Sequence, residues 1–424
     1  MNQYETQALE QLLAERGHTI VPFTQAADAY VVNSCTVTAV SDKKSRQMIR
    51  RARKQSPGAI VALCGCYAQT HPKEAEKLPV DLVAGTGDRR GFAELLEEAW
   101  RHRRPVAAVD DAFSRLQFES LPAGGLEGRT RAMLKVEDGC VNFCAYCIIP
   151  YARGRVRSLP IPQAVEEVRR LAAEGYREIV LTGIEISSWG QDLKDGSTLI
   201  DLLEAVSAAA GNMRLRLGSL EPRTITEDFC RRAAALPSLC PQFHLSLQSG
   251  CDETLRRMNR KYDTARFLES AALLRQFFDD PAITTDLIVG FPGETEAEFE
   301  KTLAFLRRCG FAQMHIFPYS IRPGTPAAKM EQVDKAVKEA RAGRAAAVAA
   351  ALHRDYLLRQ VGRTVPVLFE EPGSAGRWRG HAPSYMVVEM PGEGLHNCTV
   401  SVRLTAVEGD ILLGERAEEG ERDV

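Results

Sequence analysis

The chain has 424 residues, of which 45% are hydrophobic and 26% charged, and its formal net charge is −2. This length is sufficient for two or three domains with cores of their own. No apolar run approaches the ~18 residues that a membrane span requires, which excludes a protein with membrane-spanning helices. The near-neutral charge excludes a general attraction to nucleic acid, so any such binding must depend on local patches.

Eleven cysteines occur in a chain that opens with Met1-Asn-Gln-Tyr-Glu, which is polar and acidic and does not match a secretory leader. We therefore expect a reducing, cytoplasmic location in which the thiols are free to bind metal instead of forming disulfides. No membrane association is expected, and we expect a monomer.

Residues 1–103 alternate helix-like and strand-like segments, which predicts a small α/β domain. An amphipathic helix is expected at 4–16, and strands are expected at 29–32 and 59–63. Cysteines lie just beyond both strands, where α/β sheets bind their ligands. They are Cys35 after the first strand and Cys64 and Cys66 after the second.

A strongly basic segment covers residues 43–54, in which seven residues are basic and none is acidic. Its basic residues are Lys43, Lys44, Arg46, Arg50, Arg51, Arg53 and Lys54. Such a run is either the solvated face of a helix or a phosphate-binding surface, and the segment alone favours neither.

A linker is expected at 104–130, because its polar, glycine-rich end offers little to bury. Soon after it, Cys140, Cys144 and Cys147 follow a CxxxCxxC spacing that lets one loop present three thiolates to one metal cluster. A 4Fe-4S cubane has four irons, so three cysteines leave one iron with open positions for a chelating ligand.

This loop resembles the signature of the radical S-adenosylmethionine (SAM) enzymes, in which SAM chelates the open iron and an electron from the cluster cleaves a carbon–sulfur bond. Tyr146 lies where that superfamily packs an aromatic side chain near the adenine. The alternatives are a zinc knot, a disulfide pair or three unrelated buried cysteines. A closed zinc site needs a fourth ligand, and His102 and His244 are distant in sequence.

Residues 131–360 repeat strand and helix, which predicts a full or partial (β/α) barrel with its active site at the carboxyl ends of the strands. Helices are expected at 162–174 and 296–308, and a long helix is expected at 333–360. The expected strands are 178–181, 214–217, 242–247, 283–289 and 313–317.

Polar residues and glycines follow several of these strands. The turn Thr182-Gly183-Ile-Glu185 resembles the Gly-Gly-Glu element of radical-SAM barrels, whose carboxylate can take a charge-assisted hydrogen bond from the SAM ammonium group. Ordinary turn chemistry is the alternative for each short pattern. The candidate SAM-binding residues are Tyr146, Thr182, Gly183, Glu185, Ser219, Glu221, Gln248, Asp286 and Gly290.

Residues 361–424 contain short β-like runs broken by Gly and Pro, which predict a small antiparallel β-barrel. The expected strands are 364–369, 385–389, 399–404 and 411–413. Candidate phosphate-binding residues in this barrel are Arg377, Arg379 and Arg403.

Motifs along nearly the whole chain resemble those of the radical-SAM methylthiotransferases, most of all the MtaB-type members that convert N6-threonylcarbamoyladenosine in tRNA to its 2-methylthio derivative. The motifs are Asn2–Thr6, Asn33–Thr38, Gly65–Gln69, Asp138–Gly154, His244–Gly250 and His315–Pro326. The resemblance implies a methylthiotransferase domain at 1–103, a radical-SAM barrel with a trailing helix at 131–360, and a TRAM-like (OB-like) RNA-binding barrel at 361–424.

The resemblance also implies two 4Fe-4S clusters. Cys140, Cys144 and Cys147 would bind the SAM-cleaving cluster, and Cys35 and Cys66 would be two ligands of an auxiliary cluster. In the family a third cysteine lies after a first strand, in a Gly-Cys-Lys-Val-Asn pattern. We therefore expect one strand and one ligand upstream of Met1, which the upstream reading frame can test. Cys64 is either a substitute ligand or a bystander.

By this resemblance, one SAM methylates a sulfur held at the auxiliary cluster, and a second SAM is cleaved to a radical that activates C2 of the adenosine. The implied partners are tRNA, SAM, an electron donor and a sulfur source. Competing hypotheses within the family are methylthiolation of isopentenyladenosine in tRNA or of an aspartate on a ribosomal protein. From another class, the chain could be a non-catalytic iron–sulfur protein that binds RNA or senses redox state.

Overall fold

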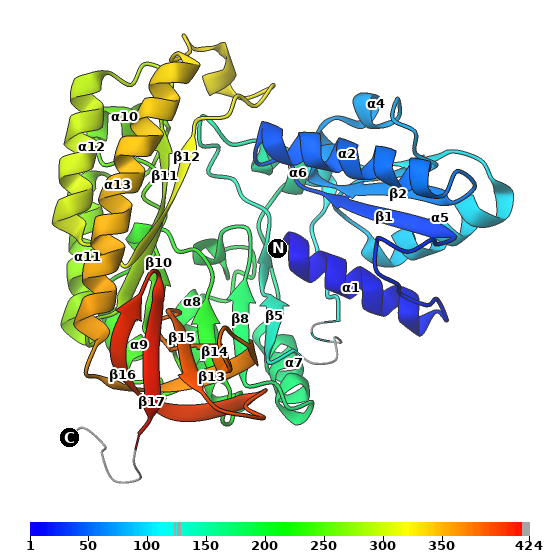
Figure 1. The fold of residues 1–424 in the computed structure, drawn as a ribbon. Coiled ribbons are helices and arrows are strands. Elements are labelled where there is room, and N and C mark those ends of the chain that lie inside the picture. The colour runs from blue at the N-terminus through cyan, green and yellow to red at the C-terminus, as the bar shows by residue number, and fades with distance from the viewer. Residues whose placement is uncertain (123, 125–128, 418–424) are drawn as a thin grey trace.

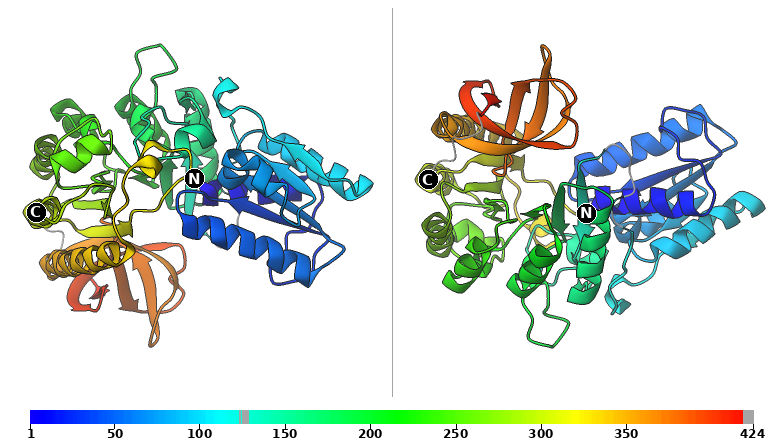
Figure 2. Two further views of the ribbon diagram at one scale, coloured as in Figure 1. Left: turned by 90° about the horizontal axis from the view of Figure 1, so that it is seen from above. Right: turned by 90° about the horizontal axis from the view of Figure 1, so that it is seen from below.

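The computed structural model describes residues 1–122, 124 and 129–417, so most of the glycine-rich end of the expected linker lies outside the described residues. The chain forms an α/β domain, an open barrel of parallel strands and a small closed barrel (Figure 1). The α/β domain lies beside the open barrel, and the closed barrel packs against one end of it (Figure 2). The predicted fold class is confirmed.

The amino-terminal domain is a four-stranded parallel sheet with strands in the order β1-β2-β3-β4. Apolar residues of α1 and α5 cover one face of the sheet, and those of α2, α3 and α4 cover the other. The last strand, β4, comes from residues that we expected to be linker. The elements are α1 Asn2–Glu15, β1 Ala29–Ser34, α2 Ala39–Gln55, β2 Ile60–Gly65, α3 Cys66–Thr70, α4 Pro72–Ala75, β3 Leu82–Ala84, α5 Arg89–His102 and β4 Val106–Ala108.

The central barrel consists of two parallel sheets, β5-β8-β9 and β10-β11-β12, joined by an isolated parallel bridge between Leu220 and Leu245. Among the described residues no pairing joins β5 to β12, so the barrel is open on that side. The strands are β5 Arg131–Lys135, β8 Glu178–Thr182, β9 Arg214–Leu217, β10 Gln242–His244, β11 Ala282–Val289 and β12 Gln313–Pro318.

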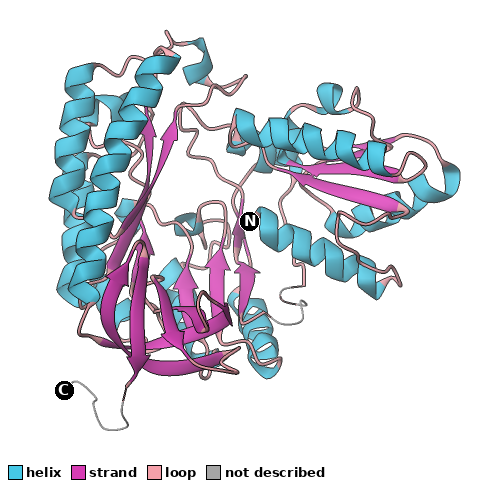
Figure 3. Ribbon diagram, viewed as in Figure 1, coloured by secondary structure: helices cyan, strands magenta, loops and turns pink. Residues whose placement is uncertain are grey.

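Helices cover the outside of the open barrel, as Figure 3 shows. Alternate strand residues such as Ile179, Leu181 and Phe243 pack against them in the main core, which leaves the residues between them facing the lumen. Within the described residues, no helix is long and apolar enough to cross a membrane. The helices are α7 Ile161–Ala173, α8 Leu199–Ala209, α9 Glu227–Ala234, α10 Asp252–Arg257, α11 Thr264–Phe277, α12 Glu296–Cys309 and α13 Lys335–Gln360.

The carboxyl-terminal strands close into a barrel in the order β13-β14-β15-β17-β16. The expectation of a purely antiparallel barrel is wrong, because β15 pairs with β17 in parallel. A closed ring of five strands cannot alternate in direction throughout, so one pair must be parallel. The strands are β13 Thr364–Pro372, β14 Arg377–His381, β15 Val387–Pro391, β16 Cys398–Glu408 and β17 Ile411–Arg416.

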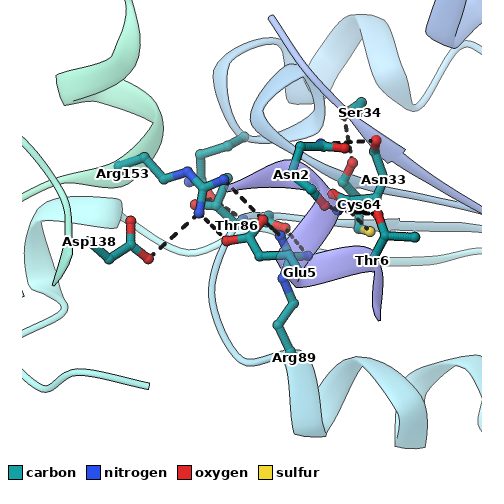
Figure 4. Close-up of polar contacts among 12 residues, drawn as sticks. Asn2, Glu5, Thr6, Asn33, Ser34, Cys64, Thr86, Arg89, Asp138 and Arg153 are labelled. Atoms are coloured by element: carbon teal, nitrogen blue, oxygen red, sulfur yellow. Dashed lines mark hydrogen bonds and ion pairs between the residues drawn. The ribbon is translucent and has the colours of Figure 1, made fainter. Parts of the chain in front are cut away.

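A buried carboxylate joins the amino-terminal domain to the central barrel. Glu5 on α1 lies between Arg89 on α5 and Arg153 on the short helix α6 (Ile149–Arg153), with Arg89 Nη2 and Arg153 Nη2 each 3.0 Å from Glu5 Oε2 (Figure 4). Arg153 Nη1 also lies 3.6 Å from Asp138 Oδ2. All four side chains are at most 8% exposed, so each charge depends on the others for compensation.

A second ion pair ties the two domains together. Arg322, in the loop after β12, lies with Nη1 2.6 Å from Asp42 Oδ2 and donates to the carbonyl oxygen of Thr36 over 3.1 Å. Arg322 and Asp42 are nearly buried, and Thr36 directly follows Cys35. The amino-terminal domain is thus held against the barrel on both sides of its cysteine loops.

Replacing Glu5 with Gln should loosen this junction, since it leaves Arg89 and Arg153 buried without a counter-charge. Breaking a buried ion pair costs about 3–5 kcal/mol, so hydrogen exchange of the α1 amides should accelerate by roughly 100-fold or more. Burial alone would raise the pKa of Glu5, but Arg153 and Arg89 outweigh it and hold the pKa below its usual value of 4.5. The stabilisation is therefore complete above pH 4.5 and declines as the pH falls further.

The exposed Glu15, near the end of the same helix, supplies the matched control. A Glu15→Gln variant should exchange like the wild type when both are followed by mass spectrometry. Equal exchange in Glu5→Gln and wild type would show that the buried carboxylate does not hold the junction.

Candidate active site

The loop of Cys140, Cys144 and Cys147 lies between β6 (Glu137–Asp138) and α6, beyond the carboxyl end of β5. Backbone hydrogen bonds fix its course: Cys140 N donates to Gly154 O over 3.0 Å and Cys147 N to Cys144 O over 2.9 Å. Gly139 has a φ of +95°, and a Cβ there would lie 1.9 Å from the carbonyl oxygen of Arg155. Only glycine fits at that position, directly before the first cysteine.

The three thiols of the loop lie near one another. Burial raises the pKa of Cys147 to about 12, and the thiols of Cys144 and, from the amino-terminal domain, Cys66 add to the rise. Burial likewise raises the pKa of Cys140, with contributions from Cys147 and Cys144. A cation faces them as well, because Arg260 Nη1 lies 3.1 Å from Cys144 Sγ.

This donor set fits a 4Fe-4S cluster, in which three cysteine thiolates each bind a different iron. The guanidinium group of Arg260 places a positive charge beside Cys144, where a thiolate bound to the cluster would be negative. Within residues 1–122, 124 and 129–417, no three His, Cys, Asp or Glu side chains are placed to share a single metal ion. A cubane does not require that convergence, because its ligands are distributed over separate irons.

Two charged side chains beside this loop match the amino-acid part of SAM. Glu185 is 8% exposed and its Oε1 is buried without a hydrogen-bond partner, as is Nη2 of Arg260. The unpaired oxygen of Glu185 can accept a hydrogen bond from the SAM ammonium group, and the unpaired nitrogen of Arg260 can donate one to the SAM carboxylate. Burial, followed by repulsion from Glu221, raises the pKa of Glu185 to about 7, and Arg260 opposes the rise.

The other candidate SAM residues lie at the carboxyl ends of the strands. Thr182 ends β8 and Gly183 begins the turn to Glu185, whose backbone N–H donates to Glu137 Oε2 over 2.7 Å. Ser219 directly follows Gly218, whose backbone N–H donates to Leu181 O on β8.

Glu221, Gln248 and Asp286 make contacts of their own near these ends. The Glu221 carboxylate is paired with Arg223, 2.6 Å away. Gln248 has a φ of +66°, and its backbone N–H donates to Asp286 O over 2.9 Å. The Asp286 side chain instead faces His244, with 3.6 Å between Oδ2 and Nε2.

Tyr146, within the cysteine loop, packs near the turn that contains Gly290. The Tyr146 ring lies edge-on to Phe291, with 6.5 Å between centroids. Gly290, the residue before Phe291, has a φ of +66°, and a Cβ there would lie 2.5 Å from Lys338 Cγ. The turn after β11 therefore requires a glycine beside this aromatic pair.

Arg260 is a candidate site residue that the sequence did not indicate. It follows α10 and reaches the cysteine loop from more than a hundred residues away, beside Tyr262, whose ring centroid lies 4.8 Å from the guanidinium carbon. An arginine in the Met258-Asn-Arg-Lys segment carries no local signal of a ligand contact. Only the folded structure brings it to Cys144.

Cys35 and Cys66 lie together at the carboxyl ends of β1 and β2, on the side that faces the barrel. Cys35 directly follows β1, and Cys66 begins α3, which packs on α6. Burial raises the pKa of the Cys66 thiol, and the charge and hydrogen bond of Arg153 oppose that rise. Cys64 lies within β2 rather than beyond it, and its side chain is buried among apolar residues of α1 and α5.

The predicted basic residues have mixed roles. Lys43, Lys44, Arg50, Arg51 and Lys54 are exposed on α2. Arg53 instead forms a 2.6 Å ion pair with Asp81, and Arg46 lies over the Tyr67 ring at 5.7 Å.

In the closed barrel, Arg377 and Arg379 pair with acids of the same barrel. Arg379 Nη2 lies 2.7 Å from Oε1 of the buried Glu389, and Arg377 Nη1 lies 3.1 Å from Glu408 Oε2. Arg403 is exposed on β16. Arg377 and Arg379 are thus already engaged within the barrel.

Comparisons with known proteins agree with this arrangement. Residues 134–306 match the model of the Radical SAM superfamily, and residues 1–85 match the family described as Uncharacterized protein family UPF0004. A Bacillus subtilis protein named threonylcarbamoyladenosine tRNA methylthiotransferase MtaB is 39% identical over 398 residues, which cover 92% of this chain and 88% of that protein. The chain belongs to the radical-SAM methylthiotransferase family.

Further relatives of this methylthiotransferase cover nearly all of it. A Thermotoga maritima protein with the same name as the Bacillus subtilis one is 36% identical, over 99% of this chain and 95% of that protein. A Desulfitobacterium hafniense protein named tRNA-2-methylthio-N(6)-dimethylallyladenosine synthase is 34% identical, over 98% of this chain and 95% of that protein. Family membership assigns a 4Fe-4S cluster and SAM to the chain, and decides against the zinc, disulfide and non-catalytic hypotheses.

Solved structures share the fold of this methylthiotransferase. The radical SAM methyltransferase TsrM from Kitasatospora setae, with cobalamin and a [4Fe-4S] cluster bound, superposes with a TM-score of 0.55 at 16% identity. The match covers 77% of this chain and 74% of TsrM. At this identity the likeness concerns the fold alone.

The raised pKa of Glu185 predicts that SAM binding depends on pH. Only the ionised carboxylate can pair with the SAM ammonium group, so affinity should rise as the pH increases through about 7 and level off above it. Glu185→Gln should weaken binding by about 10- to 150-fold at pH 8, since a hydrogen bond to a charged group is worth about 1.5–3 kcal/mol. It should also abolish the pH dependence.

Anaerobic calorimetry on the reconstituted protein measures both effects. Glu227→Gln, at an exposed position in the first turn of α9, is the matched control and should bind SAM like the wild type. A flat pH profile in the wild type, or an unchanged profile in Glu185→Gln, would rule out this role for Glu185.

Proposed function

We propose that this methylthiotransferase inserts a methylthio group at C2 of N6-threonylcarbamoyladenosine in tRNA, beside the anticodon. The observation that supports it is the end-to-end similarity to relatives that carry this name, at 39% and 36% identity. The relatives named for dimethylallyladenosine are 34% identical over comparable lengths, and they make that base the second candidate substrate.

The residues of the central barrel divide the work as follows. Cys140, Cys144 and Cys147 hold the 4Fe-4S cluster, which when bound supplies the electron that breaks a carbon–sulfur bond of SAM. Glu185 accepts a hydrogen bond from the SAM ammonium group, and Arg260 donates to its carboxylate. The rings of Tyr146 and Phe291, which pack edge to face, would border the SAM site beside the cysteine loop.

The proposal includes an auxiliary 4Fe-4S cluster at Cys35 and Cys66. The juxtaposition of Cys66 with Arg153, and the pairing of Arg322 with the residue after Cys35, supports a site for an anionic group between the domains. The third ligand expected upstream of Met1 stays a prediction. The buried position of Cys64 within β2 argues that it is a bystander and not a cluster ligand. The proposed reaction also needs two further partners, an electron donor and a sulfur source.

The exposed basic face of α2 and the closed barrel would bind the tRNA backbone, and the target base would leave its stack to reach the lumen. We further propose a cytoplasmic monomer. Of the basic residues that we expected at the RNA, those on α2 are the better candidates, because Arg377 and Arg379 are paired with acids of their own barrel.

Nucleoside analysis of tRNA tests the function. A strain that lacks the gene should lose 2-methylthio-threonylcarbamoyladenosine and retain 2-methylthio-isopentenyladenosine. The wild-type gene should restore the modification and Cys144→Ala should not, because the cluster loses a ligand. Cys398→Ala, which removes an exposed cysteine from the closed barrel, should restore it fully. If the strain instead loses 2-methylthio-isopentenyladenosine, isopentenyladenosine is the substrate and the proposal is wrong.

Salt dependence of binding tests the RNA surface on α2. Replacing Lys43, Arg50 and Arg51 with Ala should reduce the slope of log K against log salt concentration by about 2–3, because each phosphate contact contributes about 0.7–0.9. The control replaces Arg307, Arg308 and Arg354 on the outer helices α12 and α13 and removes the same charge. Equal slopes for both triple variants would remove α2 from the interface.

A further inference from the structure

A cavity of about 570 Å³ occupies the lower lumen of the open barrel, toward the amino ends of its strands. Side chains from all three units of the chain surround it. Gln3 and Gln7 of α1 lie at its rim, and Glu370 and Tyr385 belong to the closed barrel. The wall contains Gln242 and His244 of β10, Thr284 of β11, and Gln313 and His315 of β12.

The β10–β12 side of this cavity is polar because of strand alternation, whereas Met133, Val180 and Leu217 make the β5–β9 side partly apolar. On β10 the buried Phe243 points outward into the main core, so Gln242 and His244 point into the lumen. On β12 Met314 and Ile316 pack outward in the same way. The register pairs His244 with Thr284 and Thr284 with Gln313, which places three polar side chains side by side across three strands.

Part of this polar wall is already hydrogen-bonded and part is unused. Thr284 Oγ1 contacts His244 Nδ1 at 3.1 Å and Gln242 Nε2 at 3.3 Å. The His315 ring stacks on the His244 ring, with 6.4 Å between centroids. Within the described part of the chain, no hydrogen bond or ion pair engages the side chain of Gln313 or of His315. Their polar atoms are available to a ligand in the lumen.

The cavity lies on the same strands as the SAM-binding residues, below them. Along β8 the cavity reaches Val180, and the SAM residues begin two residues later at Thr182. Two residues of strand correspond to about 7 Å. On the neighbouring sheet the cavity reaches His244, the last residue of β10, and Gln248 follows in the loop beyond it. The cavity is therefore within reach of a base whose reacting carbon faces SAM.

We propose that this cavity holds the threonylcarbamoyl substituent of the target adenosine, and that His315 and Gln313 recognise its carboxylate and amide groups. The inference rests on the proposed function. C2 and C6, which carries the N6 substituent, flank N1 of the adenine, so their outward bonds diverge. A base with C2 toward SAM therefore points the substituent away from SAM, into the lumen. The polar wall then meets a substituent that carries a carboxylate, a hydroxyl and amide groups.

The same wall disfavours the dimethylallyl substituent. An isoprenoid group has no donor or acceptor, so packing it against Gln313, His315 and their neighbours would bury polar groups without partners. A site built to hydrogen-bond a substrate rejects an analogue that lacks the matching groups far more strongly than an apolar pocket rejects a smaller one. Substrate choice is thus assigned to the β10–β12 wall.

Binding measurements with three anticodon stem-loop RNAs test this assignment. The RNAs carry threonylcarbamoyladenosine, dimethylallyladenosine or plain adenosine at the same position, and each is titrated onto the full chain. The wild type should bind the first most tightly. A His315→Leu, Gln313→Leu double variant should lose about 10- to 100-fold in affinity for that RNA, the range for hydrogen bonds to a charged group, and none for plain adenosine.

Controls separate the possible failures. His102→Leu, at an exposed position on α5, should match the wild type with all three RNAs. If the wild type prefers threonylcarbamoyladenosine and the double variant keeps that preference, the cavity assignment is wrong and the proposed function stands. If the wild type prefers dimethylallyladenosine, the proposed function itself fails. If the double variant loses the same affinity for all three RNAs, the assignment is also overturned, because the substitutions then disturb the fold or the general RNA-binding surface and not recognition of the substituent.

Discussion

A carboxylate buried between two arginines fixes the relation between the two halves of this enzyme. Glu5 belongs to the first helix of the chain, Arg89 to the last helix of the same domain, and Arg153 to the short helix that follows the cysteine loop of the barrel. Desolvating these groups is costly, and the cost is offset only when all of them are in place. The junction therefore favours one arrangement of the two domains over others.

That arrangement brings the two sets of cysteines together. Arg153 follows Cys147 by six residues, and its side chain pairs with Asp138 at the start of the cysteine loop. Its charge also acts on the Cys66 thiol of the other loop. Arg322 acts in the same way on the other side, where it holds the residue after Cys35. A reaction that moves a sulfur atom from one centre to a base activated at another requires such proximity, because the reacting groups must meet without diffusing apart.

Much of the fold could be predicted from the sequence. The strands of the central barrel follow from alternating runs between helices, and β9 has the predicted bounds. The cysteine spacing predicted the loop of Cys140, Cys144 and Cys147, and the glycine turn after β8 predicted the position of Glu185 beside that loop. These features are local, and their physical causes lie within a few residues of each other.

The parts that could not be predicted depend on contacts between distant segments. Arg260 and Arg322 lie 116 and 286 residues away from the groups they contact, and nothing in their own segments indicates a partner. Arg53 has the same local sequence character as Arg50, yet it is committed to Asp81 because it lies on the inner edge of α2. The parallel pair in the closed barrel follows from the number of strands, which single segments do not reveal.

Iron-edge anomalous diffraction from crystals of the anaerobically reconstituted chain tests most directly whether the two cysteine loops face each other at an iron centre. The account predicts iron at Cys140, Cys144 and Cys147, with Cys66 beside it across Arg153. Iron at that loop with the Cys66 helix turned away, or a loop that binds no iron, would contradict it.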